Sequence, residues 1–312
     1  MQYELSPIVV SVYTRLNHLK RCIGALQKNL LAEKSELFVY SDASSRVEDD
    51  DLVKEVREYL HNIEGFKKIH IIERNKNYGG VQNASQAHRE VTEKYGKSIF
   101  MEDDIVTAPG FLIFMNEAFE FYQDNDRIVS ISGYCPPISI PNDYKKDVYL
   151  LPRFNGWGVG LTWENLKKYN IPIDRDEYII IKKNKKYILE VGGSDIPRMI
   201  QMEVEGKLDA GDVRIMYQQG VHSRYTLYPS KSLTQNIGHD GTGVHCGVSN
   251  KFHHEELWDK TDNFIFIKDI EADMRIVKSN SKFRSAGLRG KIVHLTKKIG
   301  LFPALKKLKD KI

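Results

Sequence analysis

The chain has 312 residues, of which 41% are hydrophobic and 28% charged, with a formal net charge of +4. This composition is typical of a globular protein of one or two domains, and it excludes a disordered, collagen-like or disulfide-rich chain. No apolar run approaches the ~18 residues of a membrane span, and the start of the chain lacks the basic-then-apolar order of a secretory signal. Because Cys22, Cys135 and Cys246 fit reduced thiols, we expect a protein of the cytoplasm.

Apolar periodicity in the first hundred residues alternates between that of strands and that of helices. The pattern predicts strands at 6–13, 37–40, 68–72 and 98–101, and helices at 16–30, 50–60 and 81–95. Such alternation indicates an α/β fold with an open, mostly parallel sheet flanked by helices. From about residue 128 short strands and Gly/Pro-rich loops follow, with no clear linker, so we expect the second half to extend the same domain.

Polar residues follow each of these four strands. Tyr13, Asp42, Asn77 and Glu102 belong to the segments after the first, second, third and fourth strand. Because ligands of parallel sheets bind at the carboxyl ends of the strands, we expect these segments to face one crevice.

Three consecutive acids, Glu102-Asp103-Asp104, end the fourth strand. Carboxylates grouped in a crevice repel one another unless a cation is present, and Mg²⁺ or Mn²⁺ is commonly held by one or two carboxylates together with substrate phosphates. The triplet therefore predicts a divalent metal site. A solvated acidic turn is the alternative.

These motifs, in this order, resemble the bacterial family 2 inverting glycosyltransferases of the GT-A fold. The resemblance covers about residues 6–250 and rests on 6–15, 40–42, 75–80 and the acid triplet, whose Glu-Asp-Asp form is similar to that of N-acetylglucosaminyltransferase I. It implies one GT-A domain at 1–270, with a nucleotide-sugar-binding half at 1–127 and an acceptor half at 128–270. Residues 271–312 would form a C-terminal tail.

The resemblance also implies roles for single residues. Asp104 would ligate Mn²⁺ or Mg²⁺ at the donor diphosphate, with Asp103 beside the donor ribose or sugar, and Asp42 would bind the nucleotide base. Plain turn chemistry is the alternative for Tyr13 and Asn77. The remaining donor-binding positions are the first loop, Tyr13, Thr14 and Arg15, and the loop closing over the nucleotide, Asn77 and Gly79.

An inverting transfer needs a general base, because the acceptor hydroxyl loses its proton as it attacks the anomeric carbon. By resemblance this base is an acid of the second half, and Asp212 fits best, with Asp209 close by and Glu203 or Glu205 as rivals. The aromatic residue usual before this acid is replaced by Gly211. An acid that only stabilises a helix N-terminus is the alternative.

Two Gly-containing segments of the second half complete the predicted site. Trp157, between glycines, offers a flat apolar face on which a sugar ring can stack, unless it is simply a core residue. His245 is similar in position to a family loop residue that completes the metal shell, with His239 and Asp240 as second choices. Zinc binding by residues 239–254 is a weaker alternative, because the His and Cys spacings match no usual zinc pattern. Trp163 we expect in the interior.

The positive charge is concentrated in the tail. Residues 282–312 hold ten Lys and Arg and one acid, a net charge of +9, so the other 281 residues carry −5. Apolar residues recur every three or four positions between these lysines, as in a basic amphipathic helix that binds an anionic membrane surface. Packing of this helix on the body is the alternative. We expect no nucleic-acid partner, because the body is acidic.

Together these features predict a metal-dependent inverting glycosyltransferase. The donor would be a nucleotide-diphosphate sugar, by resemblance most often a UDP-sugar, and the acceptor a hydroxyl of a glycan or lipid-linked molecule in cell-surface polysaccharide synthesis. A sugar-phosphate nucleotidyltransferase is one alternative, although the loop after the first strand has no glycine. A catalytically silent carbohydrate-binding protein is the other.

Overall fold

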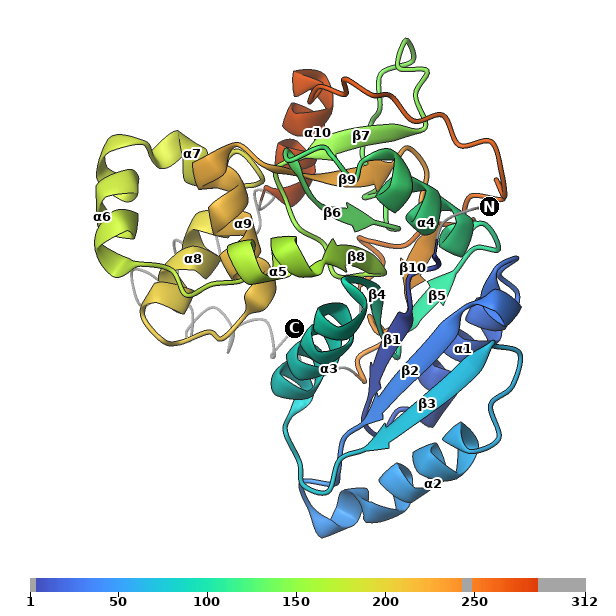
Figure 1. Ribbon diagram of the computed structural model, residues 1–312. Coiled ribbons are helices and arrows are strands. Elements are labelled where there is room, and N and C mark those ends of the chain that lie inside the picture. Colours follow the sequence, from blue (N-terminus) through green and yellow to red (C-terminus); the bar gives the residue numbers. More distant parts are fainter. Residues whose placement is uncertain (1–3, 243–248, 286–312) are drawn as a thin grey trace, which may run out of the picture.

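An eight-stranded sheet forms the centre of the structure, a computed structural model that describes residues 4–242 and 249–285 (Figure 1). Its strand order is β3-β2-β1-β4-β8-β6-β9-β7, and β10 pairs with β5 in a separate ribbon. The strands are β1 (Ile8–Val12), β2 (Glu36–Ser41), β3 (Lys68–Glu73), β4 (Lys97–Glu102), β5 (Ile105–Thr107), β6 (Ile128–Ser132), β7 (Val148–Leu151), β8 (Val159–Thr162), β9 (Tyr225–Pro229) and β10 (Thr234–Asn236). The α-helices are α1 (Leu16–Gln27), α2 (Asp50–Leu60), α3 (Gly80–Tyr95), α4 (Phe111–Phe121), α5 (Trp163–Tyr169), α6 (Arg175–Asn184), α7 (Lys186–Glu190), α8 (Ile196–Val204), α9 (Gly211–His222) and α10 (Met274–Arg284), and short 3-10 turns lie at Ala32–Lys34 and Val47–Asp49.

The predicted α/β architecture is confirmed. Strands β3, β2, β1 and β4 pair in parallel, as do β6 and β9, while β8 and β7 run antiparallel to their neighbours. The predicted strands and helices of the first hundred residues all form. The first helix ends at Gln27 rather than residue 30, because the buried Asn29 side chain donates to the Ala25 carbonyl and accepts from the Leu112 amide.

Successive residues of the strands point to opposite faces of the sheet, and each face has its own core. Val10 and Val12 lie in the cluster formed with α1, α2 and α4, whereas Val9 lies in the cluster formed with α3, α5, α6, α8 and α9. Both clusters contain residues from before and after position 128. The two halves therefore share their core.

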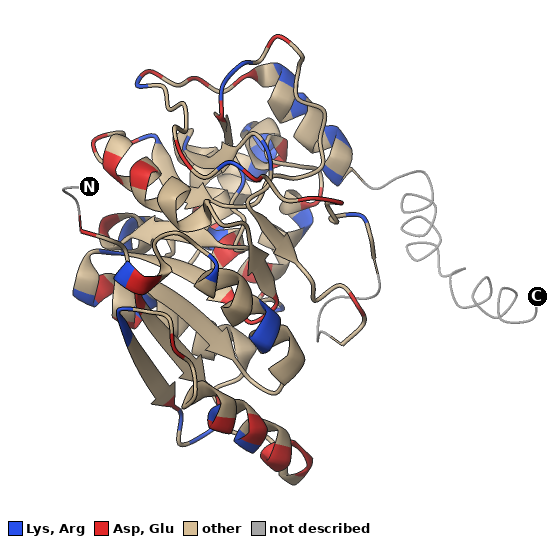
Figure 2. Ribbon diagram, turned by 90° about the vertical axis from the view of Figure 1, so that its right-hand side faces the viewer, with Lys and Arg blue, Asp and Glu red and all other residues tan. Residues whose placement is uncertain are grey.

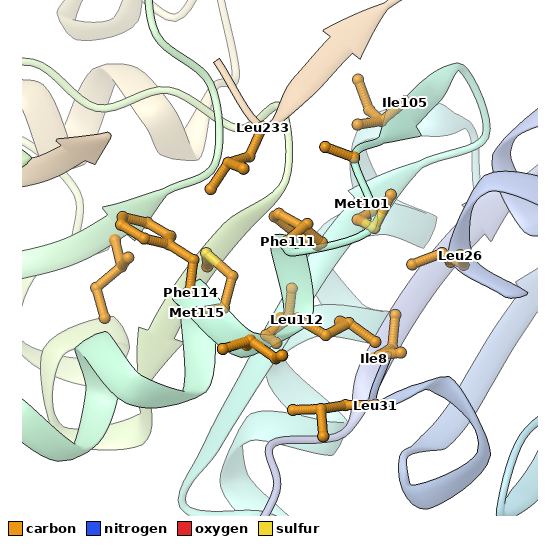
Figure 3. Close-up of a cluster of buried hydrophobic side chains, with 14 of the residues drawn as sticks. Ile8, Leu26, Leu31, Met101, Ile105, Phe111, Leu112, Phe114, Met115 and Leu233 are labelled. Carbon is orange, nitrogen blue, oxygen red and sulfur yellow. The ribbon is translucent and has the colours of Figure 1, made fainter. Parts of the chain in front are cut away.

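Helix α4 is apolar on nearly all sides because it is enclosed. Figure 3 shows Phe111, Leu112, Phe114 and Met115 among side chains from β1, α1 and β4. All four are fully buried. This packing joins the first strand of the chain to the β6 side of the sheet.

The second half contains more helix than its sequence pattern suggested. Helices α5 to α9 form a group at one side of the sheet (Figure 1), between β8 and β9. These helices are short, and two of them begin at side-chain caps: Thr162 accepts from the Asn165 amide and Asp174 from the Glu177 amide. Such caps are local signals, but the loose apolar spacing after residue 128 obscured them.

The β5–β10 ribbon is the feature of the fold that shapes the site. Antiparallel pairing sets Asn236 opposite Ile105, directly after the acid triplet. A segment more than 130 residues downstream therefore lies beside the carboxyl end of β4.

The first part of the predicted tail packs on the body. Ile276 and Val277 of α10 are buried against Tyr149, Leu151 and other residues of the β7–β9 side. Residues 286–312, on which most of the tail prediction falls, lie outside the described residues. In the part of the chain that the structure describes, no helix is long and apolar enough to cross a membrane. Figure 2 shows Lys and Arg interspersed with Asp and Glu over one side of the body, including along α2.

Candidate active site

The carboxyl ends of β1 and β4 bring Arg15 and two acids together. Asp103 and Asp104 are only 4% and 5% exposed. The Arg15 guanidinium forms an ion pair with Asp103, and its Nη2 lies 2.9 Å from Asp104 Oδ2. A buried pair of carboxylates needs a compensating cation, and in this structure Arg15 provides it. The predicted convergence of the first loop and the acid triplet is thus observed.

The segment after β10 completes the surroundings of Asp104. Asn236 Nδ2 donates to Asp104 Oδ1 at 3.3 Å, and the Ile237 amide donates to the Asp104 carbonyl at 2.9 Å. The Asn236 side-chain oxygen accepts from the Gly238 amide at 2.8 Å. A Cβ atom on Gly238 would lie 2.1 Å from Asp104 Oδ2, so only glycine fits here.

This contact predicts that Gly238→Ala destabilises the protein. The added methyl must displace the buried Asp104 carboxylate or the backbone, at a cost of about 1–3 kcal/mol in unfolding free energy. Gly24→Ala is the matched control, because Gly24 is within α1 with open space around it, and alanine there is expected to be neutral or stabilising. Urea unfolding of both variants checks this, and equal stabilities would contradict it.

Glu102 differs from its two neighbours because water reaches its side chain. The surrounding protein nevertheless removes part of the hydration of its carboxyl group. This burial, reinforced by the charges of Asp104 and Asp103, raises the pKa of Glu102 to about 8. Burial likewise raises the pKa of Asp103 to about 6, although Arg15 opposes the shift. The site therefore holds protons near neutral pH that isolated carboxyl groups would have lost.

A raised pKa links folding to pH in a definite direction. The folded protein keeps the Glu102 proton up to about pH 8, whereas the unfolded chain releases it near the ordinary glutamate pKa of 4.5, so the free energy of unfolding falls as pH rises between these values. Glu102→Gln should make this fall shallower, by on the order of 1 kcal/mol because the side chain is water-accessible. Denaturant unfolding at pH 5 and pH 8.5 measures it, with the exposed Glu256→Gln as control. Parallel pH curves for wild type and Glu102→Gln would contradict the assignment.

The residues around Asp104 fit a hard divalent cation. Their ligand atoms are the oxygens that Mn²⁺ and Mg²⁺ prefer, and the Arg15 guanidinium shows that a positive charge is accommodated between the two acids. Among residues 4–242 and 249–285, no three His, Cys, Asp or Glu side chains are grouped as metal ligands. His245 lies outside the described residues.

Asp42, Asn77 and Gly79 meet at the carboxyl ends of β2 and β3, as predicted, but they bind one another. The buried Asp42 carboxylate accepts from the Ala43, Tyr78 and Gly79 amides at 2.9–3.0 Å and from Asn77 Nδ2 at 3.3 Å. Gly79 has φ +77°, which favours glycine. Asp42 therefore organises this loop, and contact with a base would have to replace some of these bonds.

The other first-loop residues line the same edge. Tyr13 Oη donates to Asp49 Oδ2 at 2.8 Å and accepts from the Ser45 amide at 2.9 Å, so the ring is fixed against residues 43–49. The Thr14 carbonyl accepts from the Leu16 amide at the start of α1, at 3.1 Å.

Asp212 is the best placed of the four candidate bases. Glu203 accepts from Arg214 Nε at 2.6 Å and from the Ala210 amide at 3.0 Å, Asp209 also pairs with Arg214, and Glu205 pairs with Lys207 at the surface. Asp212 forms no ion pair with a described residue; its Oδ1 accepts from the Val213 amide at 2.9 Å.

The surroundings of Asp212 also suit a base. Like Glu102, Asp212 has an exposed side chain whose carboxyl group loses part of its hydration to the surrounding protein, and this burial raises its pKa. Its charge is the last of the causes that raise the pKa of Glu102, so the two carboxylates are near enough to interact electrostatically.

Trp157 lies in a group of contacting aromatic side chains near Asn236. The partly buried Trp157 contacts Tyr134, His239 and Phe252 with ring centroids 4.7, 5.3 and 5.5 Å apart. A cavity of about 430 Å³ adjoins Asn236, His239 and Phe252. Trp157 therefore belongs to an aromatic wall (Trp157, Tyr134, Phe252), of which Phe252 lines the cavity.

Trp163 is not a purely interior residue. It is partly buried, packs on the core and lines a cavity of about 610 Å³ together with residues of α3, α5 and α9. Arg89 lies 5.4 Å above its ring.

The other candidate ligands that the structure describes, His239, His254 and Asp240, bind neighbouring protein groups. His239 Nδ1 lies 3.1 Å from Asn236 Oδ1, and His254 Nε2 lies 2.6 Å from the Cys135 carbonyl. Asp240 interacts with His18 and Thr242. Cys22 and Cys135 are free and buried, in agreement with reduced thiols.

Three residues of the site were not singled out from sequence. Glu102 was visible only as part of the triplet, and Asn236 and Gly238 only as part of a downstream segment. The Gly-rich composition of 238–243 was the available signal, but nothing local to it indicated contact with Asp104.

Solved structures to which this chain is similar include glycosyltransferases of low sequence identity. TarS residues 1–349 from S. aureus are 10% identical (TM-score 0.41; 74% of this chain and 60% of that chain covered). A mannosyltransferase from Pyrobaculum calidifontis, in complex with GDP-Man and Mn²⁺, is 16% identical (TM-score 0.37; 54% and 47%), and mouse xyloside xylosyltransferase 1 is 11% identical (0.38; 71% and 83%). The chain matches a third to three fifths of the length of the TarS structures.

The comparison with curated proteins gives no match. The model of the family "Glycosyl transferase family 2" matches residues 8–182, more than half of the chain. This region contains the first loop, the Asp42 loop, the acid triplet and Trp157. The chain therefore belongs to glycosyl transferase family 2.

Proposed function

We propose that this protein is a metal-dependent inverting glycosyltransferase that moves a sugar from a UDP-sugar to a hydroxyl of a glycan or lipid-linked acceptor in cell-surface polysaccharide synthesis. One observation carries the proposal: buried Asp103 and Asp104, compensated by Arg15, lie at the carboxyl edge of the sheet, and the exposed carboxylate of Asp212 is near enough to interact electrostatically with the adjacent Glu102. In this proposal the two buried acids hold the cation and Asp212 accepts the proton.

Asp212 acts as the general base in this proposal. It removes the proton of the acceptor hydroxyl as the oxygen attacks the anomeric carbon from the side opposite the leaving nucleotide diphosphate. A pKa raised by burial suits this role, because a base with a pKa nearer neutral accepts a proton more readily. The partly buried Trp157 offers a ring against which the transferred sugar packs.

The donor nucleotide would lie along the first loop and the Asp42 loop. Asp104, and Asp103 beside it, would hold Mn²⁺ or Mg²⁺. When bound, such an ion neutralises charge on the leaving diphosphate. Arg15 carries a positive charge at the same place, and the Asn236 amide keeps the Asp104 carboxylate oriented.

The two alternatives make different chemical predictions. A sugar-phosphate nucleotidyltransferase would release pyrophosphate from a nucleoside triphosphate, and its usual glycine-rich first loop is absent from Tyr13-Thr14-Arg15-Leu16. A silent carbohydrate-binding protein would turn over no donor. The family match and the retained acids favour the transferase.

A nucleotide-sugar panel tests the proposal. Melting temperature is measured with UDP-, GDP- and other activated sugars, each with and without Mn²⁺, since a ligand of the native state stabilises it in proportion to affinity and concentration. We expect a Mn²⁺-dependent increase with UDP-sugars, followed by release of UDP on turnover. No stabilisation by any donor would overturn the proposal.

For the tail we propose peripheral binding to an anionic membrane at its cytoplasmic face, on the sequence pattern alone. Each Lys near such a surface contributes about 1 kcal/mol. We expect the full chain to co-sediment with phosphatidylglycerol vesicles and not with phosphatidylcholine vesicles, and deletion of residues 288–312 to abolish this. Sedimentation unchanged by the deletion would refute it.

A further inference from the structure

Two arginines converge behind the aromatic wall. Arg153, which follows β7, is 6% exposed and binds Asp195 through two hydrogen bonds of 2.9 and 2.8 Å. Arg284 ends α10, and a Cβ on Gly193 would meet both Arg153 Nη1, at 2.8 Å, and Arg284 Cβ, at 3.1 Å. The two side chains therefore pass the same point of the chain.

The Arg284 guanidinium lacks the partner that Arg153 has. It lies over the rings of Phe252 and Phe283, at 5.1 and 5.4 Å, and forms no ion pair with any residue the structure describes. Its Nε is buried without a hydrogen-bond acceptor in the same part of the chain. Leaving a buried donor unpaired destabilises the folded protein, and more so when the group is charged.

A third cation adds to this excess. Lys251 Nζ lies 4.8 Å from the Phe283 ring centroid and 5.5 Å from that of Phe252, and the nearby charge of Arg284 is among the causes that lower its pKa, after burial. Burial, and next the charge of Arg153, lower the pKa of Arg284 to about 10, so it stays protonated at neutral pH. Within the described residues, Asp195 is the single carboxylate in an ion pair with these three cations.

The cluster lies on the acceptor side of the site. Phe252, which Arg284 covers, contacts Trp157 and His239, and His239 in turn approaches Asn236 beside Asp104. The aromatic wall thus stands between Arg284 and the Arg15–Asp104 pair. Arg153 also affects the pKa of Asp212, by lowering it, so the cluster is near the proposed base.

We infer that Arg284, Lys251 and Arg153 form a binding site for a phosphate group of the acceptor. The two positive charges left over by Asp195 match the charge of about −1.5 to −2 on a phosphate monoester, and its oxygens supply the acceptor that Arg284 Nε lacks. Anchored there, a phosphate-bearing acceptor presents a hydroxyl toward Asp212. This assignment of the acceptor's chemistry rests on the proposed function.

Calorimetric titration of the full chain with inorganic phosphate tests the site. Wild type should bind phosphate, Arg284→Gln at least tenfold more weakly, and Arg284→Lys with an intermediate affinity. Lys282→Gln is the matched control, because it removes the same charge from an exposed position of α10 and should bind within twofold of wild type. If Arg284→Gln does not fold, the exposed Lys251→Gln replaces it, with a threefold or greater loss expected.

Two further arms separate the sources of the phosphate. Saturating UDP with Mn²⁺ should leave phosphate binding intact, and displacement by UDP would assign the cluster to the donor and overturn the inference. Farnesyl phosphate and glucose 6-phosphate then compete with inorganic phosphate, and whichever displaces it identifies a lipid or a glycan source. Displacement by neither, or equal binding by wild type and Arg284→Gln, also overturns it. Failure of UDP to bind at all contradicts the proposed function instead, and leaves the phosphate result standing.

Discussion

Asp104→Asn is expected to lower sugar transfer by on the order of 10³-fold. The Asp104 carboxylate is buried, receives one bond from Asn236 and faces Arg15, so the substitution removes a charge at the point where a cation must be held without changing the shape of the side chain. Initial rates of UDP release from UDP-sugars with Mn²⁺ measure the effect. The Mn²⁺-dependent part of the thermal stabilisation by UDP should disappear as well.

Asp269→Asn provides the control for net charge. Asp269 is exposed and forms no ion pair with a described residue, so the variant should keep wild-type rates. An Asp104→Asn enzyme that retains more than a tenth of the rate, or that keeps its response to Mn²⁺, would show that the cation is bound elsewhere.

Asp212→Asn is expected to lower transfer by about 10²- to 10⁴-fold, the usual contribution of a general base. Donor binding should be unaffected, because Asp212 begins α9, whereas the proposed donor loops follow β1, β2, β3 and β4. The wild-type kcat/KM should rise with pH through the raised pKa of Asp212, since the base must be deprotonated. That limb should be missing from the variant.

Asp209→Asn is the neighbouring control. Asp209 pairs with Arg214 at the surface and should tolerate the change. A wild-type rate for Asp212→Asn would rule it out as base. A loss with Asp209→Asn alone would transfer the role to that residue.

Much of the first half followed from local pattern. The β-branched runs and the three-and-four spacing predicted the parallel strands and their helices, because each strand and helix buries one face against its neighbours and so carries a period of its own. Parallel pairing then places all strand ends at one edge, which is why Arg15 meets Asp103 and Asp104, and why Asp42 meets Asn77 and Gly79.

The second half followed less well. Helices α5 to α8 are short, and the fold of this region depends on packing against α3 and the sheet rather than on strong local periodicity. Short helices are marginal in isolation, and tertiary contacts supply most of their stability. Their sequences therefore have only a weak helical periodicity from which the helices could be predicted.

By itself, the sequence determined the fold class, the acids at the end of β4 and the family, because all three depend on residues close together along the chain. Only the tertiary structure decided what surrounds those acids. The β5–β10 pairing brings Asn236 and Gly238 to Asp104, and the packing of α10 brings Arg284 to Arg153. Both contacts join segments more than 130 residues apart through backbone pairing and burial. Such contacts depend on the arrangement of the whole chain and leave no periodic signal in either segment.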